Sequence, residues 1–213
     1  MIPFRVKVCG VTRPEDAAVA VRYGADMIGM IFAKSSPRFV TEDTVEQILP
    51  MIPPVVFRVG VFVNDPIDEV LLTGARFGLD FLQLHGPYSD EDVRRARRGG
   101  FRVIRLHLIK SEEDYRDLYV DPADLVLLDN GNAAQPGGTG VQFDWSLRPP
   151  SPVVNLMLAG GITAENVAEG LGIFEPLVVD VNSGVEAEPG MKSLDKLKHF
   201  FEVCNTLRYG RCS

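Results

Sequence analysis

Two side chains in the sequence could exchange protons with a bound substrate. Cys9 follows the apolar stretch 5–8 and precedes Gly10, which has no side chain to keep a ligand at a distance. A thiolate there would be a base if nearby positive groups lowered its pKa; otherwise Cys9 is a packed apolar residue. Asp129 follows the apolar stretch 125–128 and is either a turn residue or a carboxyl that donates a proton. The pair suggests acid–base catalysis that needs no metal ion.

Four other side chains could line a binding site for an anionic ligand. Arg38 lies in a short polar stretch, where an Arg is commonly only solvated, yet its planar guanidinium also suits bidentate binding of a carboxylate. Lys7 would add local positive charge. His85 and Asp180 lie at the ends of apolar stretches, and His85 either lines the site or is held by its own hydrogen bonds. We therefore treat all four as candidate substrate-binding residues.

Two turns that contain glycine are candidates for phosphate binding. Gly160 and Gly161 end one apolar stretch, and Ser183 and Gly184 follow the next one. Tight turns alone would account for both. Backbone N–H groups in such turns, together with a helix N-terminus, also bind phosphate in barrel enzymes.

The elements that must position these residues alternate along the chain. Eight apolar stretches predict strands, at 5–9, 26–32, 55–63, 81–84, 102–108, 125–129, 154–159 and 177–181. Between them lie residues typical of helix starts: Thr12 with Glu15, Asp65 before Pro66, Ser89 with Asp92, Ser111 with Asp114, and Thr163 with Glu165 and Asn166. The stretch before residue 148 predicts only a long loop and a stub of helix at 143–147.

This alternation predicts a single (β/α)₈ TIM barrel with eight parallel strands. The 213 residues give roughly 27 per unit, which fits a compact barrel and leaves no length for a second domain. We expect the barrel to occupy residues 1–205, followed by a tail at 206–213. The rival fold, an open doubly wound sheet, lacks its Gly-rich fingerprint here. In a barrel, the first and sixth strands face each other across the mouth, so Cys9 and Asp129 could flank one substrate.

Composition narrows the classes of partner. The formal net charge of −7 argues against nucleic acid and anionic membranes as partners, and no apolar stretch is long enough to cross a membrane. The three cysteines lack the spacing of a zinc site or a disulfide framework, so we expect a cytoplasmic protein without a metal. The basic run 94–98 is interpreted as a solvated helix, with pairs from Asp90 to Arg94 and from Glu91 to Arg95.

Taken together, these residues resemble the phosphoribosylanthranilate isomerase family, the (β/α)₈ isomerases of tryptophan biosynthesis. The resemblance is carried by the stretches 7–12 (KVCGVT), 36–39 (SPRF), 58–64 (RVGVFVN), 82–86 (LQLHG), 127–129 (LLD), 137–140 (GGTG), 143–145 (FDW), 159–161 (AGG) and 180–186 (DVNSGVE). The departures are Asn182, where Ser is frequent, and the stretch 191–193. Neither departure involves Cys9 or Asp129.

The resemblance implies an Amadori rearrangement of N-(5-phosphoribosyl)anthranilate to 1-(2-carboxyphenylamino)-1-deoxyribulose 5-phosphate, with no cofactor. It makes Asp129 the general acid, Cys9 the general base and Arg38 the residue that holds the anthranilate carboxylate. It places Asp180 at the bridging amine or the sugar hydroxyls. It implies that Gly161, Ser183 and Gly184 bind the phosphate. The protein would be a monomer or a homodimer.

Two other functions stay open from the sequence. One is another phosphosugar barrel, either a metal-dependent epimerase or an aldolase with a Schiff-base lysine; the other is a barrel that binds a phosphorylated ligand without turnover. We also hypothesise that the Gly-rich loop 131–140 closes over the substrate.

Overall fold

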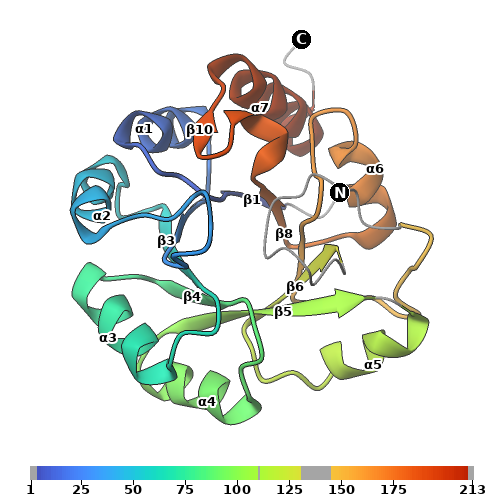
Figure 1. Cartoon of the computed structure of the whole chain (residues 1–213). Helices are drawn as coiled ribbons and strands as arrows, with labels where there is room; N and C mark the ends of the chain where they lie inside the picture. Colours follow the sequence, from blue (N-terminus) through green and yellow to red (C-terminus); the bar gives the residue numbers. More distant parts are fainter. Residues whose placement is uncertain (1–3, 110, 131–144, 211–213) are drawn as a thin grey trace.

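A closed barrel of eight parallel strands forms the centre of the protein (Figure 1). The computed structural model describes residues 4–109, 111–130 and 145–210. Each strand pairs with its neighbours along the chain, and β8 closes the barrel on β1. The strands are β1 (Arg5–Val8), β2 (Met27–Ile31), β3 (Phe57–Phe62), β4 (Phe81–Leu84), β5 (Arg102–Ile109), β6 (Leu125–Asn130), β7 (Leu156–Leu158) and β8 (Val178–Val181). The predicted fold class is confirmed.

Helices surround this barrel on its outside (Figure 1). They are α1 (Pro14–Tyr23), α2 (Glu42–Ile48), α3 (Ile67–Phe77), α4 (Asp90–Arg98), α5 (Tyr115–Leu118), α6 (Val167–Phe174) and α7 (Leu194–Tyr209). A small antiparallel hairpin, β9 (Glu186–Glu188) with β10 (Met191–Lys192), lies between β8 and α7. In the stretch predicted as a helix stub, residues 145–147 form a turn, and 143–144 lie outside the described residues.

The strands are apolar on both faces because each face packs against a different core. Outward side chains such as Val6, Ile28 and Leu82 join the core under the helices. Inward side chains such as Met27, Ile104 and Met157 fill the barrel. This two-sided burial explains why the strands read as continuous apolar stretches.

Local chemistry predicts some helix starts and not others. Ser89 forms the predicted capping box with Asp92 at the start of α4. The predicted Thr12 cap is wrong: Arg13 precedes α1, and the Thr12 hydroxyl donates instead to the carbonyl of Gly190 in the distant hairpin. The predicted Asp65 cap is also wrong: Pro66 precedes α3, and the Asp65 carboxylate accepts a hydrogen bond from Val63 N, directly after β3.

The ends of α6 and α7 differ from expectation. α6 begins at Val167, after a turn in which Asn166 Oδ1 accepts a 2.8 Å hydrogen bond from Thr163 N. α7 continues to Tyr209, so the expected boundary at residue 205 falls inside its last turns. Cys204 is buried in α7, and burial raises the pKa of its thiol to about 12. This thiol is a core side chain rather than a reactive one.

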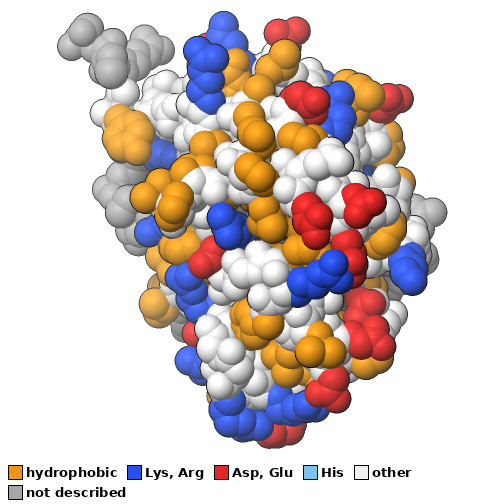
Figure 2. All heavy atoms as spheres, turned by 90° about the vertical axis from the view of Figure 1, so that its left-hand side faces the viewer, with side chains coloured by type: hydrophobic (Ala, Val, Ile, Leu, Met, Phe, Trp, Pro, Cys, Tyr) orange, Lys and Arg blue, Asp and Glu red, His pale blue; other side chains and the backbone are white. Residues whose placement is uncertain are grey.

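The surface is a mixture of charges. Figure 2 shows acidic and basic side chains interspersed with hydrophobic ones on one face. In α4, Arg94 pairs with Asp90 as predicted, at 3.5 Å. The predicted Glu91–Arg95 pair is wrong, since Arg95 reaches Asp68 on α3 and Glu91 binds Arg98. Among the described helices, none has the length and apolar character needed to cross a membrane.

Candidate active site

Cys9 lies at the mouth of the barrel, directly after β1. Its backbone N–H donates to Val181 O of β8 at 2.9 Å, so the hydrogen bonding between β1 and β8 extends one residue beyond the end of β1. The side chain packs with Ile31, Ala33 and Val61, which line the same part of the barrel. Cys9 is 5% exposed.

A buried ion pair lies next to this thiol. Lys7 Nζ is 2.8 Å from Asp180 Oδ2, and the Lys7 side chain is completely buried. Lys7 and Cys9 are two residues apart along one extended segment, so their side chains point to the same side of it. The Lys7 ammonium is close enough to the Cys9 thiol to lower its pKa. A Cβ at Gly29 of β2 would lie 3.0 Å from Cys9 Sγ and 3.1 Å from Lys7 Cε. Gly29, for which the sequence predicted no role, leaves the space that the Cys9 and Lys7 side chains occupy.

The charges around Cys9 act in opposite directions. Burial raises the pKa of the Cys9 thiol, the ammonium groups of Lys7 and Lys192 lower it, Asp180 raises it, and the net direction is upward. A lowered pKa, the condition set from the sequence for a thiolate base, is therefore not the net outcome, although positive charge is present beside the thiol. Burial lowers the pKa of Lys7, but Asp180 and Cys9 more than offset this, so Lys7 stays an ammonium.

Asp129 lies near the end of β6, across the barrel from β1. Its Oδ2 is 3.8 Å from Nε2 of His85, which follows β4 directly. Asp180 lies within electrostatic range of both Asp129 and Cys9. Its Oδ1 atom is buried and has no hydrogen-bond partner among the described residues. The structure thus brings Cys9, Asp180, Asp129 and His85 to one mouth.

Arg38 is bound inside the protein rather than exposed on a loop. Its Nε and Nη2 donate to Oε1 and Oε2 of Glu186 at 2.9 and 2.7 Å, and both side chains are buried. The edge of the guanidinium that was expected to bind a carboxylate is therefore occupied by Glu186. Lys192 Nζ also binds Glu186 Oε1, at 3.0 Å. Glu186 and Lys192 had no predicted role, and only the position of Glu186 in the last family-like stretch pointed to it.

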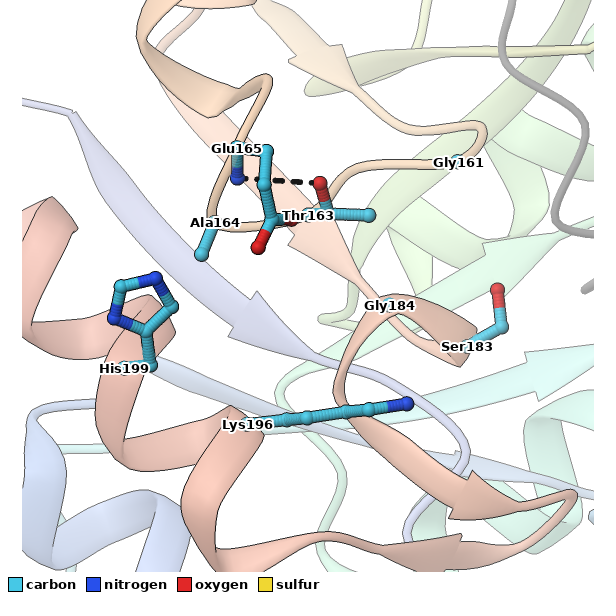
Figure 3. A pocket seen from close by; sticks show the side chains of 8 residues that line it. All are labelled: Gly161, Thr163, Ala164, Glu165, Ser183, Gly184, Lys196 and His199. Carbon is cyan, nitrogen blue, oxygen red and sulfur yellow. Dashed lines mark hydrogen bonds between the residues drawn. The ribbon is translucent and has the colours of Figure 1, made fainter.

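The two predicted phosphate-binding turns face each other across a cavity of about 370 Å³ (Figure 3). The cavity is lined by Gly161, Thr163, Ala164, Glu165, Ser183, Gly184, Lys196 and His199. A Cβ on Gly184 would lie 2.0 Å from Ile162 O, so this close approach of the two turns requires glycine. Lys196 and His199 come from one face of α7; their three-residue spacing was the available signal for them.

Two expectations concern groups that the structure does not place. The loop 131–140, hypothesised to close over the substrate, lies outside the described residues. Within the described ranges, no three His, Cys, Asp or Glu side chains gather as metal ligands.

Comparison with known proteins identifies the family. The model of the N-(5′-phosphoribosyl)anthranilate (PRA) isomerase family matches residues 6–203. The chain belongs to this family. A curated relative, the N-(5′-phosphoribosyl)anthranilate isomerase of Rubrobacter xylanophilus, is 41% identical over 204 residues, which cover 95% of this chain and 99% of the relative.

Solved structures of the family agree with this assignment. The crystal structure of the phosphoribosyl anthranilate isomerase from Thermotoga maritima has a TM-score of 0.86 and 36% identity, covering 95% of this chain and 98% of its own. Another isomerase structure, in complex with reduced 1-(o-carboxyphenylamino)-1-deoxyribulose 5-phosphate, has a TM-score of 0.82 and 36% identity, with the same coverage. The predictions of an isomerase of tryptophan biosynthesis and of its barrel are confirmed.

Proposed function

We propose that this site converts N-(5-phosphoribosyl)anthranilate to 1-(2-carboxyphenylamino)-1-deoxyribulose 5-phosphate with Cys9 as base and Asp129 as acid. The observation that carries the proposal is the placement of these two groups at the mouth of one barrel, both within electrostatic range of Asp180. A buried base and a partly exposed acid from different strands can act on C2′ and on the ring oxygen, the two ribose atoms that flank C1′.

The phosphate of the substrate would bind in the cavity between the two turns. Gly161, Ser183 and Gly184 line it, and the exposed Lys196 and His199 add basic groups at its edge. Backbone N–H groups at such turns bind phosphate without needing a net positive protein. Such local donors would allow an acidic chain, with a formal net charge of −7, to bind a dianionic group.

Ring opening is the first chemical step. Asp129 gives its proton to the ring oxygen of the ribose as the bond from that oxygen to C1′ breaks. The electron pair of the bridging amine forms the C1′–N double bond, which yields the open-chain Schiff base in its protonated form. The Asp129 side chain is 23% exposed, so it is accessible from the mouth, and His85 lies beside it.

Proton removal from C2′ is the second step. The Cys9 thiolate takes this proton, and the electrons of the broken C–H bond neutralise the Schiff base to give an enolamine. Protonation of C1′ and loss of the proton from the C2′ hydroxyl then give the ketone. Lys7 stabilises the thiolate. Oδ1 of Asp180, which has no hydrogen-bond partner among the described residues, can accept from the amine or from a sugar hydroxyl.

The aldolase alternative has a lysine in the barrel but not the right one. A Schiff-base lysine must lose its proton to become a nucleophile, which requires a lowered pKa. Lys7 has the opposite shift, because its pKa is raised by Asp180 and Cys9 against the effect of burial. Burial does lower the pKa of Lys192, but its Nζ already donates to Glu186 and to Asn182 and is not free to attack a carbonyl. A monomer or homodimer in the cytoplasm, without a nucleic-acid partner, stays a prediction.

The direct test follows the fluorescence of phosphoribosylanthranilate with the purified protein. We expect the fluorescence to fall at a rate proportional to protein concentration and the ketose product to accumulate. Binding of the reduced product analogue without any turnover would contradict the proposal and favour a barrel that only binds a phosphorylated ligand.

A further inference from the structure

Three charged side chains form a buried cluster beside the base. The cluster consists of Arg38, Glu186 and Lys192, and none of their side chains is more than 4% exposed. Glu186 Oε1 accepts from Arg38 Nε at 2.9 Å, from Lys192 Nζ at 3.0 Å and from Gly190 N at 3.1 Å. Its other oxygen accepts from Arg38 Nη2 at 2.7 Å. One carboxylate therefore holds two cations in fixed positions.

All hydrogen-bond donors of the Lys192 side chain are bound within the protein. Its Nζ donates to Glu186 Oε1 at 3.0 Å, to Asn182 Oδ1 at 2.9 Å and to Asn182 O at 3.2 Å. Three acceptors around one nitrogen match the three donors of an ammonium, whereas a neutral amine has only two. Burial lowers the pKa of Lys192, and Glu186 opposes this shift, but the three acceptors favour the ammonium form and leave no N–H group for a ligand.

The cluster lies against the residue that follows Cys9. A Cβ on Gly10 would lie 2.7 Å from Arg38 Cδ and 2.7 Å from Asn182 Oδ1. Because Nε and Nη2 of Arg38 are occupied by Glu186, Nη1 is the guanidinium nitrogen that remains outside the pair. If Glu186 stood alone with Arg38, the two charges would cancel and a ligand carboxylate would find a neutral pair.

We propose that Glu186 and Lys192 are positioning residues for the carboxylate of the substrate: Glu186 fixes the Arg38 guanidinium, and Lys192 offsets the charge of Glu186. Two cations and one carboxylate leave the cluster with one net positive charge, which Arg38 presents to the ligand. The inference rests on the proposed function, because it concerns the anthranilate carboxylate. It assigns part of the preference for a carboxylated ligand to Lys192, which has no N–H group left to contact that ligand.

The test compares two stable ligands by titration calorimetry. One is the reduced product analogue, and the other is the same molecule without the carboxylate, 1-phenylamino-1-deoxyribitol 5-phosphate. The ratio of their Kd values measures the preference for the carboxylate and cancels the phosphate and sugar contacts. The variants are Lys192→Met and the double variant Glu186→Gln/Lys192→Met, and the control is Lys198→Met, which changes an exposed lysine on α7.

The charge balance of the cluster predicts how the variants rank in their preference for the carboxylated ligand. Lys192→Met leaves a net neutral cluster and should lower the preference about tenfold, which corresponds to about 1.4 kcal/mol. The double variant removes one charge of each sign, so it should recover the preference to within about threefold of wild type, while Lys198→Met changes nothing. A merely structural Lys192 predicts a double variant at least as impaired as the single one.

Two results would overturn the inference: an unchanged preference in Lys192→Met, or no recovery in the double variant. Lys192→Gln, alone and with Glu186→Gln, gives the same comparison if the Met variant does not fold. Failure of the proposed function looks different, because the wild-type protein would then show no turnover and no preference for the carboxylated ligand.

Discussion

The ammonium group of Lys7 lies 2.8 Å from the carboxylate of Asp180 inside the barrel, and the pair is in reach of the Cys9 thiol. The pair has two consequences. It fixes Asp180 with one oxygen bound to Lys7 and the other unpartnered among the described residues. It also places a cation beside the Cys9 thiol, which opposes the rise in pKa caused by burial without cancelling it.

The activity should rise with pH because of this environment. Cys9 acts as a base only as a thiolate, and burial raises the pKa of its thiol despite the opposing charges of Lys7 and Lys192. We therefore expect kcat/KM to increase as the pH rises through neutrality and beyond. A pH–rate profile measures this, and alkylation of Cys9 followed by mass spectrometry should show the same dependence. A limb that is complete well below neutral pH would contradict the assignment.

Removal of the Lys7 charge should destabilise the fold. Lys7→Met leaves Asp180 buried without its partner, and the loss of one member of a buried pair costs about 3–5 kcal/mol. Denaturant unfolding measures the change in the free energy of unfolding. The double variant Lys7→Met/Asp180→Asn carries no unpaired charge and should recover part of this stability. A Lys7→Met variant as stable as wild type would show that the pair contributes nothing.

The sequence predicts interactions between residues that are close along the chain better than interactions between residues that are far apart. The strands follow from apolar stretches, and the Ser89–Asp92 capping box lies within one turn, so local patterns reveal both. The site contacts are different. Arg38 and Glu186 are 148 residues apart, and Lys7 and Asp180 are 173 apart. Complementary charges in a sequence do not say which pairs will meet, so Arg38 was expected to be free for a ligand.

The phosphate cavity can be tested at its tightest point. In Gly184→Ala the added Cβ would lie 2.0 Å from Ile162 O, so the two turns must move apart. We expect KM for the substrate to rise at least tenfold with a smaller effect on kcat. Gly172→Ala is the matched control: it lies in α6, and, apart from its chain neighbours and the adjacent backbone of that helix, no described atom lies within 4 Å of the added Cβ. Equal KM values for the two variants would argue against phosphate binding between these turns.

Asp129→Asn tests the acid. The substitution keeps the shape of the side chain but removes the carboxyl proton, so ring opening should slow by about 10²- to 10⁴-fold in kcat. The Kd of the reduced product analogue should stay within a few-fold of wild type, because that ligand needs no proton. Steady-state kinetics and calorimetry measure the two quantities. A retained kcat would assign the acid to another group.

Cys9→Ala tests the central claim most directly, with turnover of phosphoribosylanthranilate measured by fluorescence. Cys204→Ala is the matched control, because it changes a second buried cysteine, in α7. The account predicts a fall in kcat of about 10²- to 10⁴-fold for Cys9→Ala, with unchanged binding of the reduced product analogue, and wild-type kcat for Cys204→Ala. A kcat near the wild-type value in folded Cys9→Ala protein would contradict the assignment of Cys9 as the base.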